Sequence, residues 1–274
     1  GGFSTLNSSV GGFKSAYIDY VIIVFMFLAG SSFSLHYRFL RGDWRAHVKD
    51  YEFRWYVSLI VIAFAIIGFD TIVFRYADMG SAVRDTLFQV VSIVTTTGFG
   101  TADFEQWAPS SQYVLFCLMF IGACAGSTAG GMKIIRIIIL VKFVSNEITH
   151  AVHPHAVLPV RLGNTVVPRD VITNVVGFFA LYMAVFALGV LAMTALGLDL
   201  VSAFGATAAT LGNIGPGLGS VGPTDTGCGS ARTVFVTGHG DCRLGVQHRA
   251  DPLQQLVHQL LLRSMSVQRH GQIV

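Results

Sequence analysis

Four long apolar segments constrain the fold of this chain more than any other feature of its sequence. Each exceeds about 20 residues, the length at which an α-helix crosses a hydrocarbon layer roughly 30 Å thick. The sequence therefore predicts an all-α membrane protein. The four predicted spans are Tyr17–Leu40, Trp55–Ala77, Tyr113–Val144 and Val171–Leu198.

The overall composition supports this prediction. Charged residues make up 12% of the 274 residues, against roughly 25% in soluble domains, and hydrophobic residues make up 53%. Such a chain cannot cover a soluble core with polar surface, which disfavours soluble globular, disordered and nucleic-acid-binding proteins. The four cysteines show no CxxC spacing, so we expect neither a disulfide framework nor a zinc site.

The basic residues predict how the spans are oriented. They gather in Arg38–Arg54 and recur from Lys133 to Arg169, so both connections should be cytoplasmic by the positive-inside rule. The connections on the other side fit, because Asp70–Gln112 has few basic residues and Asp199–Thr224 has none.

Each outer connection also contains an apolar stretch that is too short to cross the membrane. These stretches, Ala82–Val94 and Leu200–Leu211, begin near an acid (Asp85 and Asp199), which suits the positive end of a helix. Each ends in a polar turn with glycines. Irregular backbone at membrane depth is tolerated where protein buries it or where it lines a water-filled cavity, so we expect both turns to line a pore.

An internal repeat supports this interpretation. Trp55–Gly98 and Asp170–Gly215 each contain a span, a short helix and a glycine turn, in that order. Gly1–Thr5 aligns with Thr97–Thr101 and predicts the tail of a third copy.

Backbone carbonyls at such turns can replace the hydration shell of a cation, which is the chemistry of a K⁺ filter. A single turn of this kind is better explained as a helix C-cap, but three at matching places favour the filter. The predicted filter residues are Gly1, Gly2, Phe3, Thr95, Thr96, Thr97, Gly98, Phe99, Gly212, Asn213, Ile214, Gly215 and Pro216.

Three strings resemble the TrkH-type K⁺ uptake proteins of the bacterial Trk/Ktr/HKT superfamily: VSIVTTTGFGTADFEQW, GACAGSTAGGMKIIR and TLGNIGPGLGSVGPT. The resemblance implies tandem repeats of helix, re-entrant pore helix and helix around one pore, in a multi-pass protein of the bacterial inner membrane. It divides the chain into the end of the second repeat (1–54), the third repeat (55–144), a cytoplasmic connection (145–168), an incomplete fourth repeat (169–224) and a tail (225–274).

The resemblance also bears on the ion and the partners. Glycines 2, 98 and 215 favour K⁺, but the first repeat, where serine is associated with Na⁺, is absent, so a Na⁺-permeable or ion-coupled transporter stays an alternative. The resemblance implies that the chain binds no cofactor and that K⁺ is the transported ion. The implied partners are membrane lipid, a second copy in a homodimer, and a cytosolic nucleotide-binding ring of Trk-A or KTN type docked on Arg38–Arg54 and Ser145–Pro168.

The third predicted span is too long for one helix across the membrane, and small residues fill its middle. Glycines at 122, 126 and 130 could form a helix-packing face, but the length and the paired glycines favour a broken helix. The resemblance implies a gating loop here, with Lys133 and Arg136 either repelling K⁺ or anchoring the helix. The candidate gating residues are Gly122, Gly126, Ser127, Thr128, Ala129, Gly130, Gly131, Lys133 and Arg136.

The pattern changes after Thr224, where the family requires another span. Residues 225–274 contain no apolar run of the necessary length, so we expect a tail that is out of frame or otherwise aberrant. Two further functions compete with transport. An enzyme is disfavoured because HExxH, GxSxG and paired intramembrane acids are missing, and a non-conducting assembly subunit is compatible with an incomplete pore.

Overall fold

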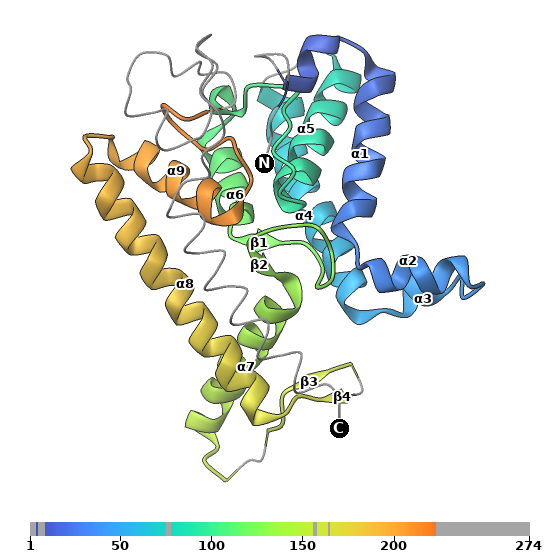
Figure 1. The fold of residues 1–274 in the computed structure, drawn as a ribbon, viewed down its shortest axis with the longest axis vertical. Coiled ribbons are helices and arrows are strands. Elements are labelled where there is room, and N and C mark those ends of the chain that lie inside the picture. Colours follow the sequence, from blue (N-terminus) through green and yellow to red (C-terminus); the bar gives the residue numbers. More distant parts are fainter. Residues whose placement is uncertain (1–3, 5–8, 75–77, 156–157, 164, 223–274) are drawn as a thin grey trace, which may run out of the picture.

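The computed structural model describes residues 4, 9–74, 78–155, 158–163 and 165–222 (Figure 1). The described part is helical, with two pairs of two-residue strands. The helices are α1 (Ala16–Gly30), α2 (Phe33–Leu40), α3 (Ala46–Lys49), α4 (Tyr51–Phe74), α5 (Met79–Val94), α6 (Pro109–Met119), α7 (Ile134–Val152), α8 (Arg169–Ala195) and α9 (Leu200–Gly212). The strands are β1 (Ile121–Gly122), β2 (Met132–Lys133), β3 (Arg161–Leu162) and β4 (Thr165–Val166), and the 3₁₀ helices are Ser9–Phe13 and Phe104–Gln106.

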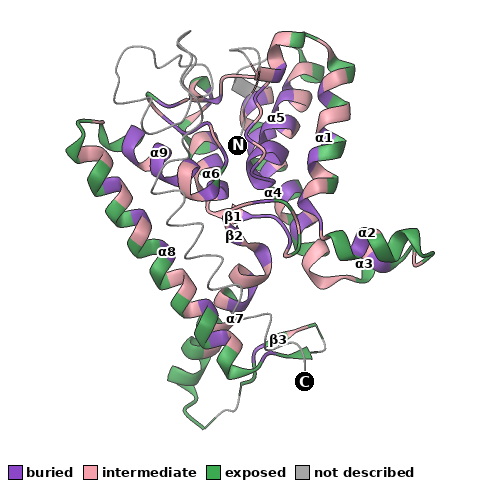
Figure 2. Ribbon diagram, viewed as in Figure 1, coloured by how far each residue is buried: buried purple, intermediate pink, exposed green. Residues whose placement is uncertain are grey.

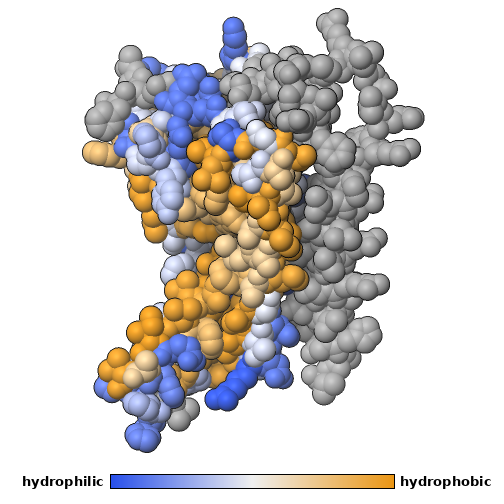
Figure 3. Space-filling model, turned by 90° about the vertical axis from the view of Figure 1, so that its left-hand side faces the viewer, coloured by the Kyte–Doolittle hydropathy of each residue, from blue (hydrophilic) through white to orange (hydrophobic). Residues whose placement is uncertain are grey.

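Two of the predicted spans are confirmed as single long helices. In the described residues, α4 over Tyr51–Ile72 and α8 over Arg169–Ala195 have mean hydropathies of 2.0 and 2.4. At 1.5 Å per residue these stretches are about 33 and 40 Å long, enough to cross a bilayer core. The face in Figure 3 is apolar across the middle of the molecule, with hydrophilic residues towards its two ends.

The first predicted span is wrong as a single helix. The segment forms α1 and α2, which meet at an angle of 100° around Ser31 and Ser32. The Ser31 hydroxyl donates to the Leu28 carbonyl at 2.8 Å, and the Phe33 N–H donates to the carbonyl of Gly126, far along the chain, at 3.1 Å. These hydrogen bonds supply partners for the Leu28 carbonyl and the Phe33 N–H, so the bend leaves neither group unsatisfied.

The third predicted span is broken, as expected. The helix ends with α6 at Met119 and resumes with α7 at Ile134, and between them β1 and β2 pair in parallel. A continuous helix with a packing face of glycines is thereby excluded.

The two short helices are confirmed as α5 and α9. The prediction that Asp199 lies at the start of α9 is confirmed, because its carboxylate accepts a hydrogen bond from Ser202 N at 3.1 Å. For α5 the prediction of Asp85 is wrong: the N-cap is Asp78, which accepts from Ser81 N at 3.0 Å. Asp85 lies further along α5, buried beside Arg84.

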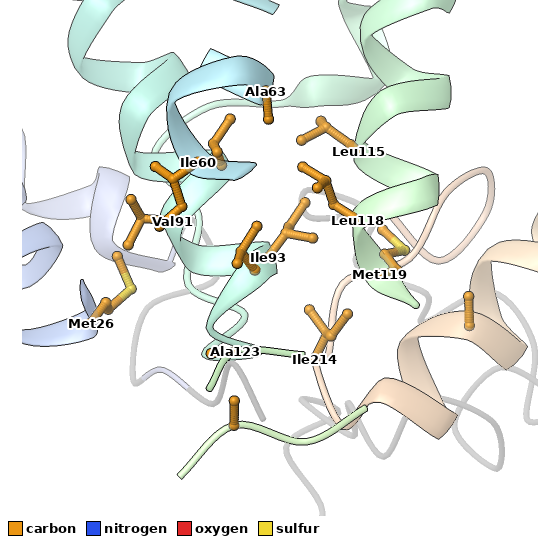
Figure 4. Packing of buried hydrophobic residues seen from close by; sticks show 14 of the residues in the cluster. Met26, Ile60, Ala63, Val91, Ile93, Leu115, Leu118, Met119, Ala123 and Ile214 are labelled. Carbon is orange, nitrogen blue, oxygen red and sulfur yellow. The ribbon is translucent and has the colours of Figure 1, made fainter. Parts of the chain in front are cut away.

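Helix α5 lies at the centre of the described part. Its second half is buried on every side, as Figure 2 shows, because it packs against α1, α4 and α6. Figure 4 shows side chains from several elements converging on one apolar cluster, among them Ile93 of α5, Met119 of α6 and Ile214. Since Ile214 follows α9, this core fixes the ends of α5, α6 and α9 relative to one another.

Candidate functional site

The two glycine turns that follow α5 and α9 have the same backbone conformation. Thr96 and Asn213 both have φ 54°, a left-handed value that is uncommon outside glycine, and two residues later Gly98 and Gly215 have φ 79° and 120°. The hydrogen bonds also match, because the N–H groups of Thr97 and Ile214 each donate to the carbonyl five residues earlier, at 2.9 Å. Both turns are therefore Schellman-type helix ends, and the repeat seen in the sequence extends to the backbone.

Side chains of α5 hold the chain that leaves the first turn. The Ser92 hydroxyl donates to the Phe99 carbonyl at 2.6 Å, and the Gln89 amide donates to the Ala102 carbonyl at 2.9 Å. Thr95 and Thr97 are linked through their hydroxyls at 2.8 Å. The short helix thus helps to fix a stretch of backbone that is itself neither helix nor strand.

The second turn is held by close backbone packing and one hydroxyl. A Cβ atom at Gly205 of α9 would lie 2.4 Å from Leu218 N, so glycine is required for this approach. Ser202 Oγ accepts from Ser220 N at 2.8 Å. The Ile214 side chain is fully buried, while Asn213 is exposed and Gly215 half-buried.

The loop of residues 120–133 lies against both turns. We call it the gating loop, after the role that the sequence predicts for its residues. Gly130 N donates to Thr96 Oγ1 at 2.7 Å, and a Cβ atom on Gly130 would lie 2.3 Å from the Gly212 carbonyl oxygen. At the loop's base, β1 and β2 pair Ile121 with Met132 and Gly122 with Lys133. The structure therefore brings Gly130, one of the predicted gating residues, next to predicted filter residues of both turns.

The far side of the gating loop contacts the bend between α1 and α2, towards which it extends in Figure 1. Cys124 N donates to the Gly30 carbonyl at 3.1 Å, and Thr128 Oγ1 donates to the Ala29 carbonyl at 3.2 Å. Gly126 has φ 73°, and its carbonyl accepts from Phe33 N. These bonds satisfy backbone groups that the bend leaves without helical partners.

The two basic residues predicted beside the loop have different surroundings. Lys133 turns back onto the loop, where its ammonium donates to Ser127 Oγ at 3.3 Å and to the Ala129 carbonyl. Arg136 points to α8 instead, with its guanidinium 4.1 Å from the centre of the Phe178 ring. Arg136 therefore contributes to the contact between α7 and α8.

Glu52 is a residue of the site that the sequence reasoning missed. It lies in the first turn of α4, and its Oε1 accepts from Ala125 N in the gating loop at 2.7 Å. In the sequence it is one acid at the start of a span within a basic connection, which gives no signal of a contact 73 residues away. The predicted filter residues Gly1, Gly2 and Phe3, and the predicted tail 225–274, lie outside the described residues.

The sequence model of the TrkH family of cation transport proteins matches residues 1–231. The chain belongs to this family. Similar curated proteins include the Trk system potassium uptake protein TrkH of Escherichia coli K12, 40% identical over 226 residues, and that of Vibrio parahaemolyticus, 40% identical over 225. Both alignments cover 81% of this chain but 46% of the relative, so the chain spans about half the length of the curated relatives it matches.

A solved structure confirms the fold of this TrkH-family chain. The crystal structure of the potassium transporter TrkH from Vibrio parahaemolyticus superposes with a TM-score of 0.78 at 35% identity. The match covers 96% of this chain and 55% of that one. The fold predicted from the sequence, an all-α membrane protein of the TrkH type, is thereby confirmed.

Proposed function

We propose that this TrkH-family chain forms part of a pore for K⁺ uptake across the bacterial inner membrane. Residues 95–99 and 212–216 would serve as two of its filter segments, with residues 1–3 in a third, and the gating loop would open and close the path beside them. One observation carries this proposal: two helix ends share the same left-handed turn, and the gating loop contacts both.

The filter would work by replacing the hydration shell of the ion. Each turn follows the C-terminal end of a short helix, where the helix dipole is negative, and its glycine permits φ values that side chains disfavour. Carbonyl oxygens at such a place suit a dehydrating K⁺ ion, and no covalent chemistry is needed.

The gate would work by moving the gating loop. The hydrogen bond from Gly130 to Thr96 and the contact with Gly212 keep it next to both turns, and Lys133 places a positive charge at its base. Opening would exchange these contacts for water and withdraw the loop from the path of the ion.

The filter is tested in the full-length gene product by growth of a bacterium deficient in K⁺ uptake on low K⁺. Gly215→Ala should abolish rescue, because a side chain at φ 120° costs about 1–3 kcal/mol and displaces the carbonyls. Gly42→Ala is the matched control, since Gly42 has φ 97°, lies in the cytoplasmic connection and has open space around it. Equal rescue by both variants would refute the filter.

The gate is tested by deleting residues 126–130. The deletion should raise K⁺ flux and weaken control by regulators. Unchanged flux with preserved regulation would reduce the loop to a packing element.

Further features of the proposal follow from the family. The repeats would occupy 1–54, 55–144 and 169–224, and 145–168 would connect them in the cytoplasm. A homodimer and a nucleotide-binding ring on the cytoplasmic face would complete the assembly, with no catalytic activity and no cofactor in this chain. A Na⁺-permeable or ion-coupled transporter remains the alternative within the family.

A non-conducting assembly subunit is the second candidate. Expression of residues 1–274 alone distinguishes the two, because a conducting chain rescues growth on low K⁺ and an assembly subunit does not.

A further inference from the structure

The carboxylate of Glu52 joins two parts of the chain that border the gating loop. Its Oε1 accepts from Ala125 N at 2.7 Å, inside the loop, and from Ile135 N at 3.3 Å, in the first turn of α7. One side chain on α4 therefore holds both the loop and the helix into which the loop leads.

Both contacts supply backbone groups with an acceptor that the local structure lacks. Ala125 lies beyond the end of β1, and Ile135 is among the first residues of α7, whose N–H groups have no partner within the helix. The acceptor is a half-buried carboxyl group at the positive end of α7, a position that favours its negative form. Hydrogen bonds to an ionised carboxylate are about twice as strong as those between neutral groups.

Lys133, the last residue of the loop, makes hydrogen bonds within the loop. Its ammonium bonds to Ser127 and Ala129 near the tip of the loop, while Glu52 bonds near its beginning and just after its end. Of these two side chains, only Glu52 lies outside the loop, whereas Lys133 moves together with its partners Ser127 and Ala129. Withdrawing the loop therefore leaves Glu52 without its bond from Ala125 N, which opposes opening.

The turn that contains Glu52 is also packed against the cytoplasmic connection. The ring of Phe53 lies 5.1 Å from that of His47 in α3, and 6.0 Å from that of Phe27 in α1, measured between centroids. A displacement of α3 therefore reaches the neighbour of Glu52 directly. This places the acid between the cytoplasmic connection and the loop.

We propose that Glu52 is a positioning residue that holds the gating loop closed and couples its release to movement of residues 33–50. The proposal rests on the proposed function of the loop as a gate.

The test uses the full-length gene product with Cys124 as a reporter. This thiol lies in the loop and is 1% exposed, so it reacts with a maleimide only when the loop moves. The other cysteines are replaced by serine. Glu52→Gln keeps the shape but removes the charge, and because charged acceptors bond about twice as strongly, labelling should be about tenfold faster.

Glu147→Gln is the matched control, because it makes the same substitution at an acid outside residues 33–50 and outside the loop. Glu147 is exposed and lies in α7, twelve residues or about 18 Å along the helix from Ile135. Its labelling rate should stay within about twofold of the parent. Glu52→Asp, with the charge kept on a shorter side chain, should lie between the parent and the glutamine variant.

A second readout separates the two proposals. Rb⁺ flux into liposomes, without regulator, should rise with Cys124 labelling in Glu52→Gln. Labelling no faster than in Glu147→Gln would overturn the role of Glu52, whereas deletion of residues 126–130 would still test the gate. Faster labelling without faster flux would support the contact between Glu52 and the loop but overturn the loop as a gate.

Discussion

Gly130→Ala changes the contact between the gating loop and the turn after α9 by a single methyl group. The new Cβ atom would lie 2.3 Å from the Gly212 carbonyl oxygen, about 1 Å inside ordinary van der Waals distance, and 3.1 Å from Asn213 Cβ. The nearer neighbour is backbone and cannot rotate away, and φ at Gly130 is not positive, so the clash is the whole perturbation.

The size of the effect follows from the cost of overpacking. An added methyl in a closely packed site costs about 1–3 kcal/mol. If the cost falls on the closed arrangement, the ratio of open to closed protein rises roughly 5- to 150-fold. Rb⁺ flux into liposomes without regulator should rise accordingly, up to the point at which most molecules are open.

Gly177→Ala in α8 is the control, because open space surrounds that position. It should leave flux unchanged and stabilise the helix by up to about 1 kcal/mol. The reasoning fails if Gly130→Ala lowers the unfolding temperature but leaves flux at the parent level. The clash would then be shared equally by the open and closed arrangements.

Two further predictions concern the short helix α5. Ser92→Ala removes the hydroxyl that donates to the Phe99 carbonyl, so the free energy of unfolding should fall by about 1–3 kcal/mol and the Rb⁺/Na⁺ flux ratio should decrease. An unchanged flux ratio would contradict the role of Ser92 in holding the proposed filter. The hydroxyl of Ser81, together with backbone N–H groups, lowers the pKa of Asp78 below its usual value of 3.8. The cap formed by Asp78 therefore stabilises the fold fully above pH 3.8 and less as the pH falls through the pKa of the folded state. Asp78→Asn should therefore lower the unfolding temperature at pH 7 but not at pH 2, and an equal loss at both values would contradict the assignment.

Much of the architecture could be predicted because hydrophobic length and glycine placement are local signals. The helices α4, α5, α8 and α9 follow from apolar runs with polar ends, and the break after α6 follows from small residues in an overlong segment. The bend after Gly30 was not predicted, since the apolar run continues through it and the Phe33 N–H finds its acceptor in Gly126. Arg136 likewise looked like a neighbour of the loop, but helical geometry turns it towards Phe178.

The sequence by itself determined that this chain lies in a membrane, that it repeats a span, a short helix and a glycine turn, and that its third span is interrupted. These properties depend on the transfer of apolar residues from water and on the φ angles that glycine permits, and both are set residue by residue. Only the tertiary structure decided what the interrupted segment touches. Its bonds to Thr96, to Glu52 and to the bend after α1 join residues 34 to about 100 positions apart, and no local pattern in the chain encodes such pairs.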